Sequence, residues 1–352
     1  MPVSRAGIVE ALAAAALFGA SAPLAKLLVG AVPPVLLAGL LYLGSGVGLL
    51  GWWLWRRRAG REAFETSLTR NDLPWLAGAI LAGGVVGPVL LMWGLVRGPA
   101  AHASLLLNLE GVFTAALAWF VFKENFDRRI AFGMVFIVAG GALLTWTDET
   151  GGRVSPWALA IAGACLAWAV DNNLTRRVSA GDPVQIAGIK GLIAGLVNTG
   201  IALSMGDAFP GAATTAAAGV VGLLGYGVSL VLFVLALRNL GSARTGAYFS
   251  TAPFIGAALS LVLLDETPGL AFWGAAAFMA IGVWLHLTER HEHLHEHEPL
   301  AHSHRHVHDE HHRHDHDVPW DGRAPHAHFH VHAPLLHSHP HYPDLHHRHA
   351  HD

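Results

Sequence analysis

The chain has 352 residues, of which 53% are hydrophobic and only 13% are charged. Globular domains carry about 25% charged residues, so this composition argues against a soluble protein and favours one embedded in a lipid bilayer. The charge is unevenly divided. Residues 1–290 hold 18 Lys and Arg against 15 Asp and Glu, whereas residues 291–352 hold 4 against 10, together with 23 of the 25 histidines.

Ten apolar segments have the length expected of membrane spans. The first begins at acidic Glu10 and is longer than the apolar part of a cleavable signal peptide, so we expect it to be retained. Short connections rich in Pro and Gly separate most of the segments. The spans run roughly over 7–29, 33–55, 74–96, 101–122, 129–147, 156–174, 184–204, 216–237, 243–264 and 270–288.

Basic residues predict the orientation of these spans, because loops rich in Lys and Arg stay in the cytoplasm. With the N-terminus inside, the inner loops hold thirteen basic residues, whereas the outer loops hold only Arg97 and Arg153. Ten is an even number, so the C-terminus is also expected inside. The sequence therefore predicts a multi-pass protein of the cytoplasmic membrane with both termini cytoplasmic.

The two halves of the apolar region resemble each other. Residues 97–124 and 238–266 both begin with Arg, continue as a span that starts with small residues, and end at a glutamate. Five spans in each half is an odd number, so the halves must have opposite orientations. We expect an all-α membrane protein with inverted five-helix repeats at residues 1–147 and 148–290, a plan found in secondary transporters.

Glycines eight residues apart in the fifth and tenth spans (Gly133 and Gly141, Gly274 and Gly282) complete the pattern. The combination resembles the drug/metabolite transporter superfamily, EamA type, over about residues 7–288. This resemblance implies an alternating-access carrier, usually an exporter driven by a proton or substrate gradient. Its relatives handle amino acids, sugars, nucleotide precursors and drugs.

Glu110 is expected near the bilayer centre, since it lies three turns into the fourth span. Ionisable groups in the membrane are costly and are functional candidates by default. A carboxyl group there could bind a proton and release it when substrate arrives, with Asn108 and His102 nearby. The alternative is a structural acid paired with Lys26 or Lys190. The ninth span has no acid at the equivalent position.

Further polar residues are candidates for substrate binding. Asp171, Asn172 and Asn173 in the sixth span either mark a frayed or broken helix end that faces the transport path, or cap a span that ends at Val170. Lys26 matches a basic residue often found late in the first span of the family. It could neutralise an anionic substrate or extend to the interface. Tyr248 and Ser250 of the ninth span complete the candidate set.

The tail at residues 291–352 alternates histidine with other residues, and its acids and prolines favour disorder without metal. Imidazole and carboxylate bind Zn, Ni and Co well. We predict that this tail binds these metals, whereas the core contains no cofactor. Its candidate ligands are His291, His293, His295, His297, His302, His304, His306, His308, His311, His312, His314 and His316.

The sequence thus predicts a transporter, not an enzyme, that exports a small polar metabolite or amino acid and whose metal-binding tail regulates it. A proton or other ion is the expected coupling species, a homodimer is compatible with the plan, and no nucleic-acid partner is expected. One alternative is an exporter of Zn, Ni or Co with the tail as metal collector or sensor. A second is a membrane-anchored metal store or sensor.

Overall fold

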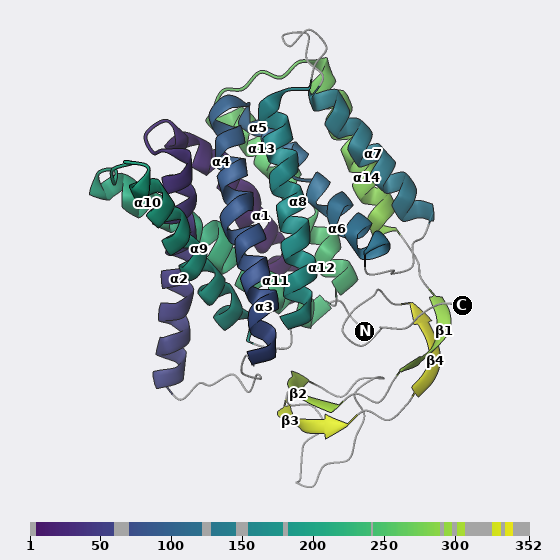
Figure 1. Cartoon of the computed structure of the whole chain (residues 1–352). Coiled ribbons are helices and arrows are strands. Elements are labelled where there is room, and N and C mark those ends of the chain that lie inside the picture. The colour runs from purple at the N-terminus through teal and green to yellow at the C-terminus, as the bar shows by residue number, and fades with distance from the viewer. Residues whose placement is uncertain are drawn as a thin grey trace.

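The computed structural model describes residues 5–59, 70–121, 128–145, 154–178, 182–240 and 242–288 of the apolar region, and four short segments of the tail. The apolar region is a bundle of helices that run mostly up and down (Figure 1). Those of the first half are α1 (Arg5–Val29), α2 (Pro34–Arg58), the 3₁₀ turn η1 (Arg70–Asp72), α3 (Leu73–Ala79), the π-helical turn η2 (Ile80–Val86), α4 (Gly87–Arg97), α5 (Ala100–Leu106), α6 (Leu109–Phe120) and α7 (Arg128–Thr145).

The second half repeats this order of elements. It comprises α8 (Pro156–Val178), α9 (Pro183–Ser204), α10 (Ala212–Gly222), the π-helical turn η4 (Leu223–Val228), α11 (Ser229–Leu240), α12 (Ser242–Phe249), α13 (Ala252–Leu263) and α14 (Leu270–Leu287). In each half the third span is widened by a π-helical turn, and the fourth span is broken into two shorter helices. The prediction of an all-α membrane protein with ten spans in two repeats is confirmed.

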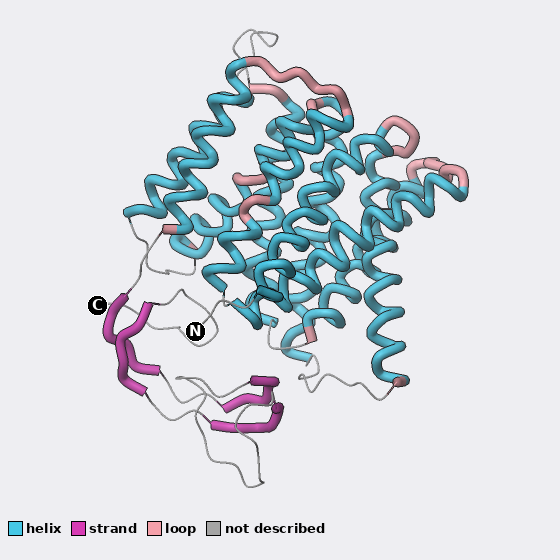
Figure 2. The backbone as a smooth tube through the Cα atoms, turned by 180° about the vertical axis from the view of Figure 1, so that it is seen from behind, coloured by secondary structure: helices cyan, strands magenta, loops and turns pink. Residues whose placement is uncertain are grey.

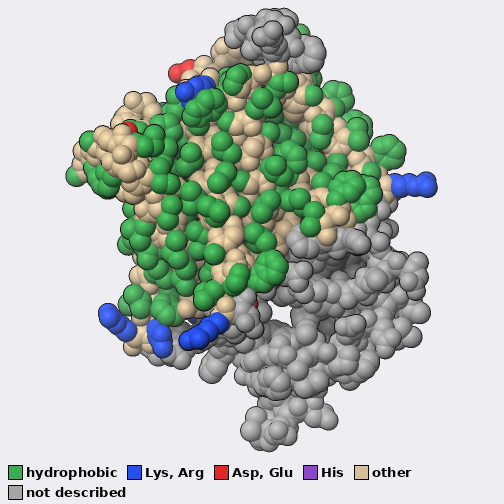
Figure 3. Space-filling view, in the orientation of Figure 1, with side chains coloured by type: hydrophobic (Ala, Val, Ile, Leu, Met, Phe, Trp, Pro, Cys, Tyr) green, Lys and Arg blue, Asp and Glu red, His purple; other side chains and the backbone are tan. Residues whose placement is uncertain are grey.

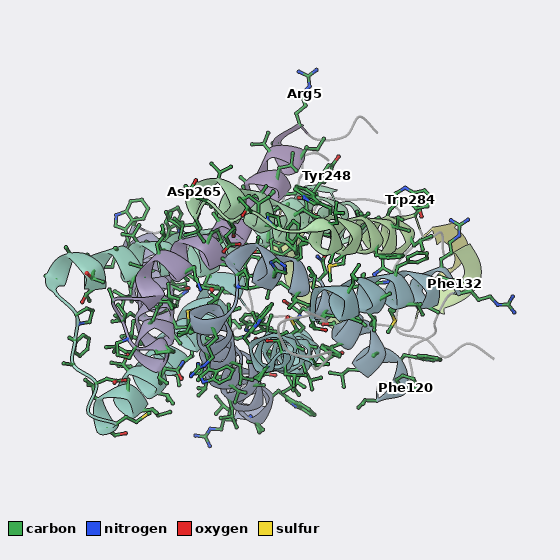
Figure 4. The ribbon with its side chains drawn as sticks, turned by 90° about the horizontal axis from the view of Figure 1, so that it is seen from above. Arg5, Phe120, Phe132, Tyr248, Asp265 and Trp284 are labelled. Atoms are coloured by element: carbon green, nitrogen blue, oxygen red, sulfur yellow. The ribbon has the colours of Figure 1, made fainter. Side chains whose placement is uncertain are left out.

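Length and composition support membrane insertion of most spans. Among the described residues, eight helical segments are long and apolar enough to cross a bilayer, and α13 is a shorter apolar helix. Apolar side chains cover the middle of the molecule, and Lys and Arg side chains lie at the lower end of the bundle, near its top and at its right edge (Figure 3). Phe132 and Trp284 are 61% and 60% exposed and lie at the rim of the bundle (Figure 4), as expected of side chains that face lipid.

Contacts between the halves follow the repeat. Helix α1 of the first half packs against α11 and α13 of the second half, and α8 of the second half packs against the corresponding α4 and α6 of the first. The pairs α2–α9 and α7–α14 join equivalent spans across the halves, and the paired α7 and α14 form one side of the bundle (Figure 2). The two repeats are therefore related by an approximate two-fold axis, which is the arrangement that inverted orientation requires.

Small residues allow the closest of these contacts. A Cβ atom added at Gly282 of α14 would lie 2.6 Å from the Gly133 carbonyl oxygen of α7, and one added at Gly133 would lie 2.8 Å from the Gly282 oxygen. These two glycines do not occupy equivalent positions in the two repeats, yet they face each other across the axis. Their backbones touch because neither has a side chain, as is common between membrane helices.

The described parts of the tail are extended. Strand β1 (Glu292–His297) pairs with β4 (Leu335–Pro340), and β2 (Ala301–His306) pairs with β3 (His326–Val331), both antiparallel. The rest of the tail lies outside the described residues, so its disorder without metal stays a prediction. The expected boundary between the halves, at residues 147 and 148, also lies outside them.

Candidate functional site

The fourth span is discontinuous where the candidate acid lies. Helix α5 ends at Leu106 and α6 begins at Leu109. Between them the backbone tightens, because the amide of Asn108 donates to the Leu105 oxygen (3.1 Å) and that of Glu110 to the Leu107 oxygen (3.1 Å). Glu110 thus lies in the first turn of α6, where the partial positive charge of the helix N-terminus favours a carboxylate. Such broken spans build the binding sites of many secondary transporters.

Glu110 bonds across the two halves of the molecule. The side-chain amide of Asn172 in α8 donates to Glu110 Oε1 over 2.8 Å and also reaches the Thr114 hydroxyl over 3.4 Å. Asn172 thereby links the second half to the first turn of α6, which carries Glu110. The bond therefore joins the break of the fourth span to the second repeat.

A second acid, Asp171, lies next to Asn172 in the sequence of α8. Asp171 Oδ1 is 2.5 Å from Lys190 Nζ of α9 and accepts a 2.7 Å bond from the Thr175 hydroxyl, which in turn accepts from Lys190 over 3.0 Å. Asp171 is 8% exposed. A Cβ atom at Gly83 would overlap its carboxylate, so the acid packs directly on the widened turn η2. Its ion pair with Lys190 compensates for the burial of both charges.

The carbonyl oxygens of η2 are bound by side chains from three spans. Tyr42 Oη and Trp168 Nε1 each donate to the Gly83 oxygen over 2.9 Å, and Asn198 Nδ2 donates to the Gly84 oxygen over 2.9 Å. The turn has π-helical spacing, since the Gly87 amide bonds the Ala82 oxygen. The next residue, Pro88, has no amide hydrogen to give Gly83, so side chains from neighbouring spans satisfy the carbonyl groups instead.

Aromatic rings connect this region to the second half. Tyr42 stacks on Tyr226 of η4 with ring centroids 5.5 Å apart, and Tyr226 meets the edge of Phe18 at 6.2 Å. Phe18 in turn lies 5.4 Å from Phe249 of α12. The rings form an apolar wall that passes from α2 through η4 and α1 to the break between α12 and α13. Sequence reasoning missed this wall, since aromatic residues are common in membrane spans.

Neither expectation for the sixth span is correct. Helix α8 continues through Val178, so the span neither ends at Val170 nor breaks at the polar residues. Instead the side chains of Asp171, Asn172 and Asn173 leave the helix in different directions within one turn. Asn173 donates to the Ala169 oxygen over 2.8 Å and to the Thr114 oxygen of α6 over 3.4 Å, while its two neighbours bind Lys190 and Glu110. A continuous helix can carry the three polar residues because each has its own partner.

The two lysines bind groups other than Glu110. Lys26 lies in the last turn of α1 and donates to the carbonyl oxygens of Leu95 and Gly98 (2.9 Å to the latter), which close α4. Lys190 pairs with Asp171, as described above. The expectation that Glu110 forms a structural pair with Lys26 or Lys190 is therefore wrong. Lys26 acts as a C-terminal cap of α4, in keeping with the preference of cations for that end of a helix.

Glu266 caps the next helix, α5, beside the end of α4. Its carboxylate accepts the Ala100 amide over 2.7 Å and the Ala101 amide over 2.9 Å, which are first-turn donors of α5 with no partner inside the helix. Glu266 lies in the connection between α13 and α14. The turn between α4 and α5 is thus held by a cation on one side and an anion on the other. The sequence showed Glu266 only as the end of a repeated segment.

The other candidates lie around these groups. Asn108 donates to the Leu105 oxygen over 2.9 Å and lies 3.9 Å from Met279 Sδ, so it supports the break and faces α14. His102 packs between Trp157 and Phe272, and within the described part of the chain its buried Nδ1 has no hydrogen-bond partner. It lies in the first turn of α5, away from the first turn of α6.

Tyr248 and Ser250 belong to the break in the ninth span. The Tyr248 oxygen accepts the Thr251 hydroxyl over 2.6 Å, and the Ser250 amide bonds the Gly246 oxygen over 2.9 Å. Gly19 of α1 packs against the Ala252 carbonyl at this break. The ninth span thus repeats the geometry of the fourth without its acid.

The structure describes only some of the candidate metal ligands of the tail. His293, His295 and His297 lie in β1, and His302, His304 and His306 lie in β2. The remaining six candidates lie outside the described residues. Among the residues whose side chains are described, no three His, Cys, Asp or Glu are grouped as a metal site.

Comparison with known proteins decides the family. The model of the EamA-like transporter family matches residues 5–146 and again residues 155–288. The chain belongs to the EamA-like transporter family. Its members are transporters, so the protein is a multi-pass membrane transporter and not an enzyme. The double match also agrees with the two structural repeats.

Individual relatives agree with this assignment. The chain is 26% identical over 296 residues to an uncharacterized transporter of Methanothermobacter thermautotrophicus, covering 79% of this chain and 85% of the relative. It is 34% identical over 113 residues to the probable 4-amino-4-deoxy-L-arabinose-phosphoundecaprenol flippase subunit ArnE of Pseudomonas fluorescens, covering 32% of this chain and 92% of ArnE. A crystal structure of another protein is similar with a TM-score of 0.58 at 21% identity, over 79% of this chain and 94% of that one, which shows a shared fold.

Proposed function

We propose that this EamA-family transporter is a secondary active exporter of a small polar metabolite or amino acid across the cytoplasmic membrane, with both termini in the cytoplasm. The observation that carries the proposal is the bond between Glu110 and Asn172. It joins the two halves at the break of the fourth span, where an acid can exchange a proton or a cationic group of the substrate for its amide partner.

The groups around this bond fit a polar organic solute. They offer a carboxylate, an amide and a hydroxyl at Glu110, Asn172 and Thr114, and an apolar wall of rings from Tyr42 to Phe249. Hydrogen-bonding groups of fixed position beside apolar surface are typical of small-molecule sites. We therefore assign Glu110 the coupling or substrate-binding role, with Asn172 as its partner in the state that the structure shows.

The test uses the full-length protein in proteoliposomes with an imposed pH gradient. Radiolabelled amino acids and small polar metabolites are screened for gradient-driven uptake, with Glu110→Gln as the variant and Glu266→Gln as the matched control. Glutamine keeps the size and the acceptor oxygen for Asn172 but cannot exchange a proton. We expect Glu110→Gln to abolish gradient-driven uptake and Glu266→Gln to retain it. Uptake that persists in Glu110→Gln with the same pH dependence would contradict the role of Glu110.

The histidine-rich tail favours one other function, the export of Zn, Ni or Co with the tail as collector or sensor. The same vesicles, loaded with a metal-sensitive dye, distinguish the two. Metal uptake that requires Glu110 would establish the metal carrier, whether or not residues 291–352 are present. If no solute and no metal crosses while the tail still binds metal, the membrane-anchored store or sensor becomes the better explanation.

A further inference from the structure

The strands of the tail bring histidines to directly opposed positions. In the pair β2–β3, His302 faces His330, His304 faces His328 and His306 faces His326. In the pair β1–β4, His293 faces His339 and His295 faces His337. Five of the twelve opposed pairs are thus histidine with histidine. All five partners on the returning strands, at residues 326–339, lie outside the candidate ligands between His291 and His316.

The two strand pairs belong to one hairpin. The residue numbers of each opposed pair add up to the same value in β1–β4 and in β2–β3. Three residues separate β1 from β2, and three also separate β3 from β4. The two strand pairs therefore share one register. The chain direction reverses between β2 and β3, since these strands are antiparallel.

The histidines shift between odd and even positions at the same place in both arms of this hairpin. Histidines occupy odd-numbered positions in β1 and even-numbered positions in β2. On the returning strand they occupy even positions in β3 and odd positions in β4. Since successive strand residues alternate between faces, this joint change keeps histidine opposite histidine in both segments. Two independently random histidine runs would have no reason to change together.

We propose that the pairs in β2–β3 and β1–β4 are transition-metal sites, and that binding of a divalent ion such as Zn²⁺ orders the tail in this register. Opposed residues in an antiparallel pair lie about 5 Å apart, and neighbours two positions along a strand share a face. The three pairs of β2–β3 thus place six histidines on one face. Neutral imidazole is a preferred ligand of Zn²⁺. The proposal deepens the metal-binding role of the tail and is independent of the solute transported.

The decisive variant moves one histidine without changing composition. His328→Ala combined with Ala327→His places the imidazole on the other face, opposite Arg305. A tail that chelates metal without order has the same ligands in the same segment, whereas the proposed site loses its central pair. The second variant adds His304→Arg and Arg305→His, which restores a histidine pair because residue 305 faces residue 327. A swap of Arg348 and His349, outside the strand pairs, is the control.

Two measurements are made on the full-length protein in detergent. Competition with a chromophoric chelator gives the affinity and number of Zn²⁺ ions bound. Trypsin cleavage after the arginine of β2 reports ordering of that strand; this arginine is Arg305, except in the second variant, where the arginine is at position 304. Cleavage after the arginine at position 348, or at position 349 in the control, is the reference in the same sample. In the wild type we expect Zn²⁺ to slow cleavage after Arg305 selectively. We expect the first swap to weaken the tightest site by about tenfold, corresponding to about 1.4 kcal/mol, and to remove the protection. The double swap should recover much of both.

Each other outcome overturns part of the proposal. If the first swap changes neither affinity nor protection, the tail binds metal without this register, and the pairing is refuted while a metal-binding tail remains. If the first swap weakens binding but the double swap does not restore it, the opposed positions are not those of the structure. If the wild type binds no Zn²⁺ through residues 291–352, both the pairing and the metal-binding tail are refuted.

Discussion

Asp171 and Lys190 form a 2.5 Å ion pair that joins α8 to α9 at the widened turn η2. Both side chains are largely buried, so removal of one partner leaves a charge without compensation in a place from which water is mostly excluded. We expect Lys190→Met or Asp171→Leu to reduce the free energy of unfolding by about 3 kcal/mol. Thermal unfolding in detergent, followed by loss of the monodisperse peak in size-exclusion chromatography, measures this.

A double variant provides the control for this pair. Asp171→Leu combined with Lys190→Met removes both charges and leaves apolar side chains of similar size. Because replacement of a buried ion pair by apolar groups is often tolerated, we expect the double variant to melt above either single variant. If the effects of the two single variants simply add, the pair is not the interaction that stabilises this junction.

The contact between Gly133 and Gly282 predicts that alanine substitutions at different glycines differ sharply in their effect on stability. Gly282→Ala places a Cβ atom 2.6 Å from the Gly133 oxygen, so α7 and α14 must separate and lose packing, at a cost of about 1–3 kcal/mol. Gly111→Ala in α6 is the matched control, since an added Cβ there meets no atom within 4 Å. Alanine favours a helix over glycine, so the control should melt no lower than the wild type. Equal melting of the two variants would contradict the close contact.

The caps of α4 and α5 predict that Lys26 and Glu266 stabilise the fold without binding substrate. Glu266→Ala removes the acceptor of two amides of α5, and loss of such a cap costs about 1 kcal/mol. Lys26→Met removes the donor to the carbonyl groups that end α4. We expect both variants to lower the melting temperature and to leave the substrate concentration for half-maximal uptake unchanged. A large change of that concentration in Lys26→Met would instead return Lys26 to the substrate site.

The sequence predicted the spans well because each is a long apolar run between polar turns. The expected span 156–174 corresponds to Pro156–Val178, and 243–264 to the α12–α13 pair that ends at Leu263. The expected depth of Glu110 in the bilayer stays a prediction, whereas its place along the span, in the first turn of α6, is observed. The prediction failed where polar residues were interpreted without their partners. Asn172 looked like a helix end only because its contact with Glu110 joins distant parts of the chain.

Other site residues gave no local signal. Tyr42, Trp168 and Asn198 occur within apolar spans, and each acts through a carbonyl group on another helix. The pairing of Lys190 with Asp171 could not be distinguished from a pairing with Glu110, because both acids lie in spans that α9 could approach. Pro88 was the available sign of a disturbed helix, since proline removes a backbone hydrogen bond in any span.

Pro88 and Trp168 are expected to depend on each other. Trp168→Phe keeps an aromatic ring but removes the N–H group that bonds Gly83, which should cost about 1 kcal/mol. Pro88→Ala adds a backbone amide that can bond the same carbonyl group, so the loss of the indole donor should then cost much less. The four proteins of this double-mutant cycle are compared by thermal unfolding, with Trp273→Phe, at a position 53% exposed, as the control. If Trp168→Phe costs the same with and without Pro88, the missing amide of Pro88 does not explain why side chains bind the Gly83 carbonyl.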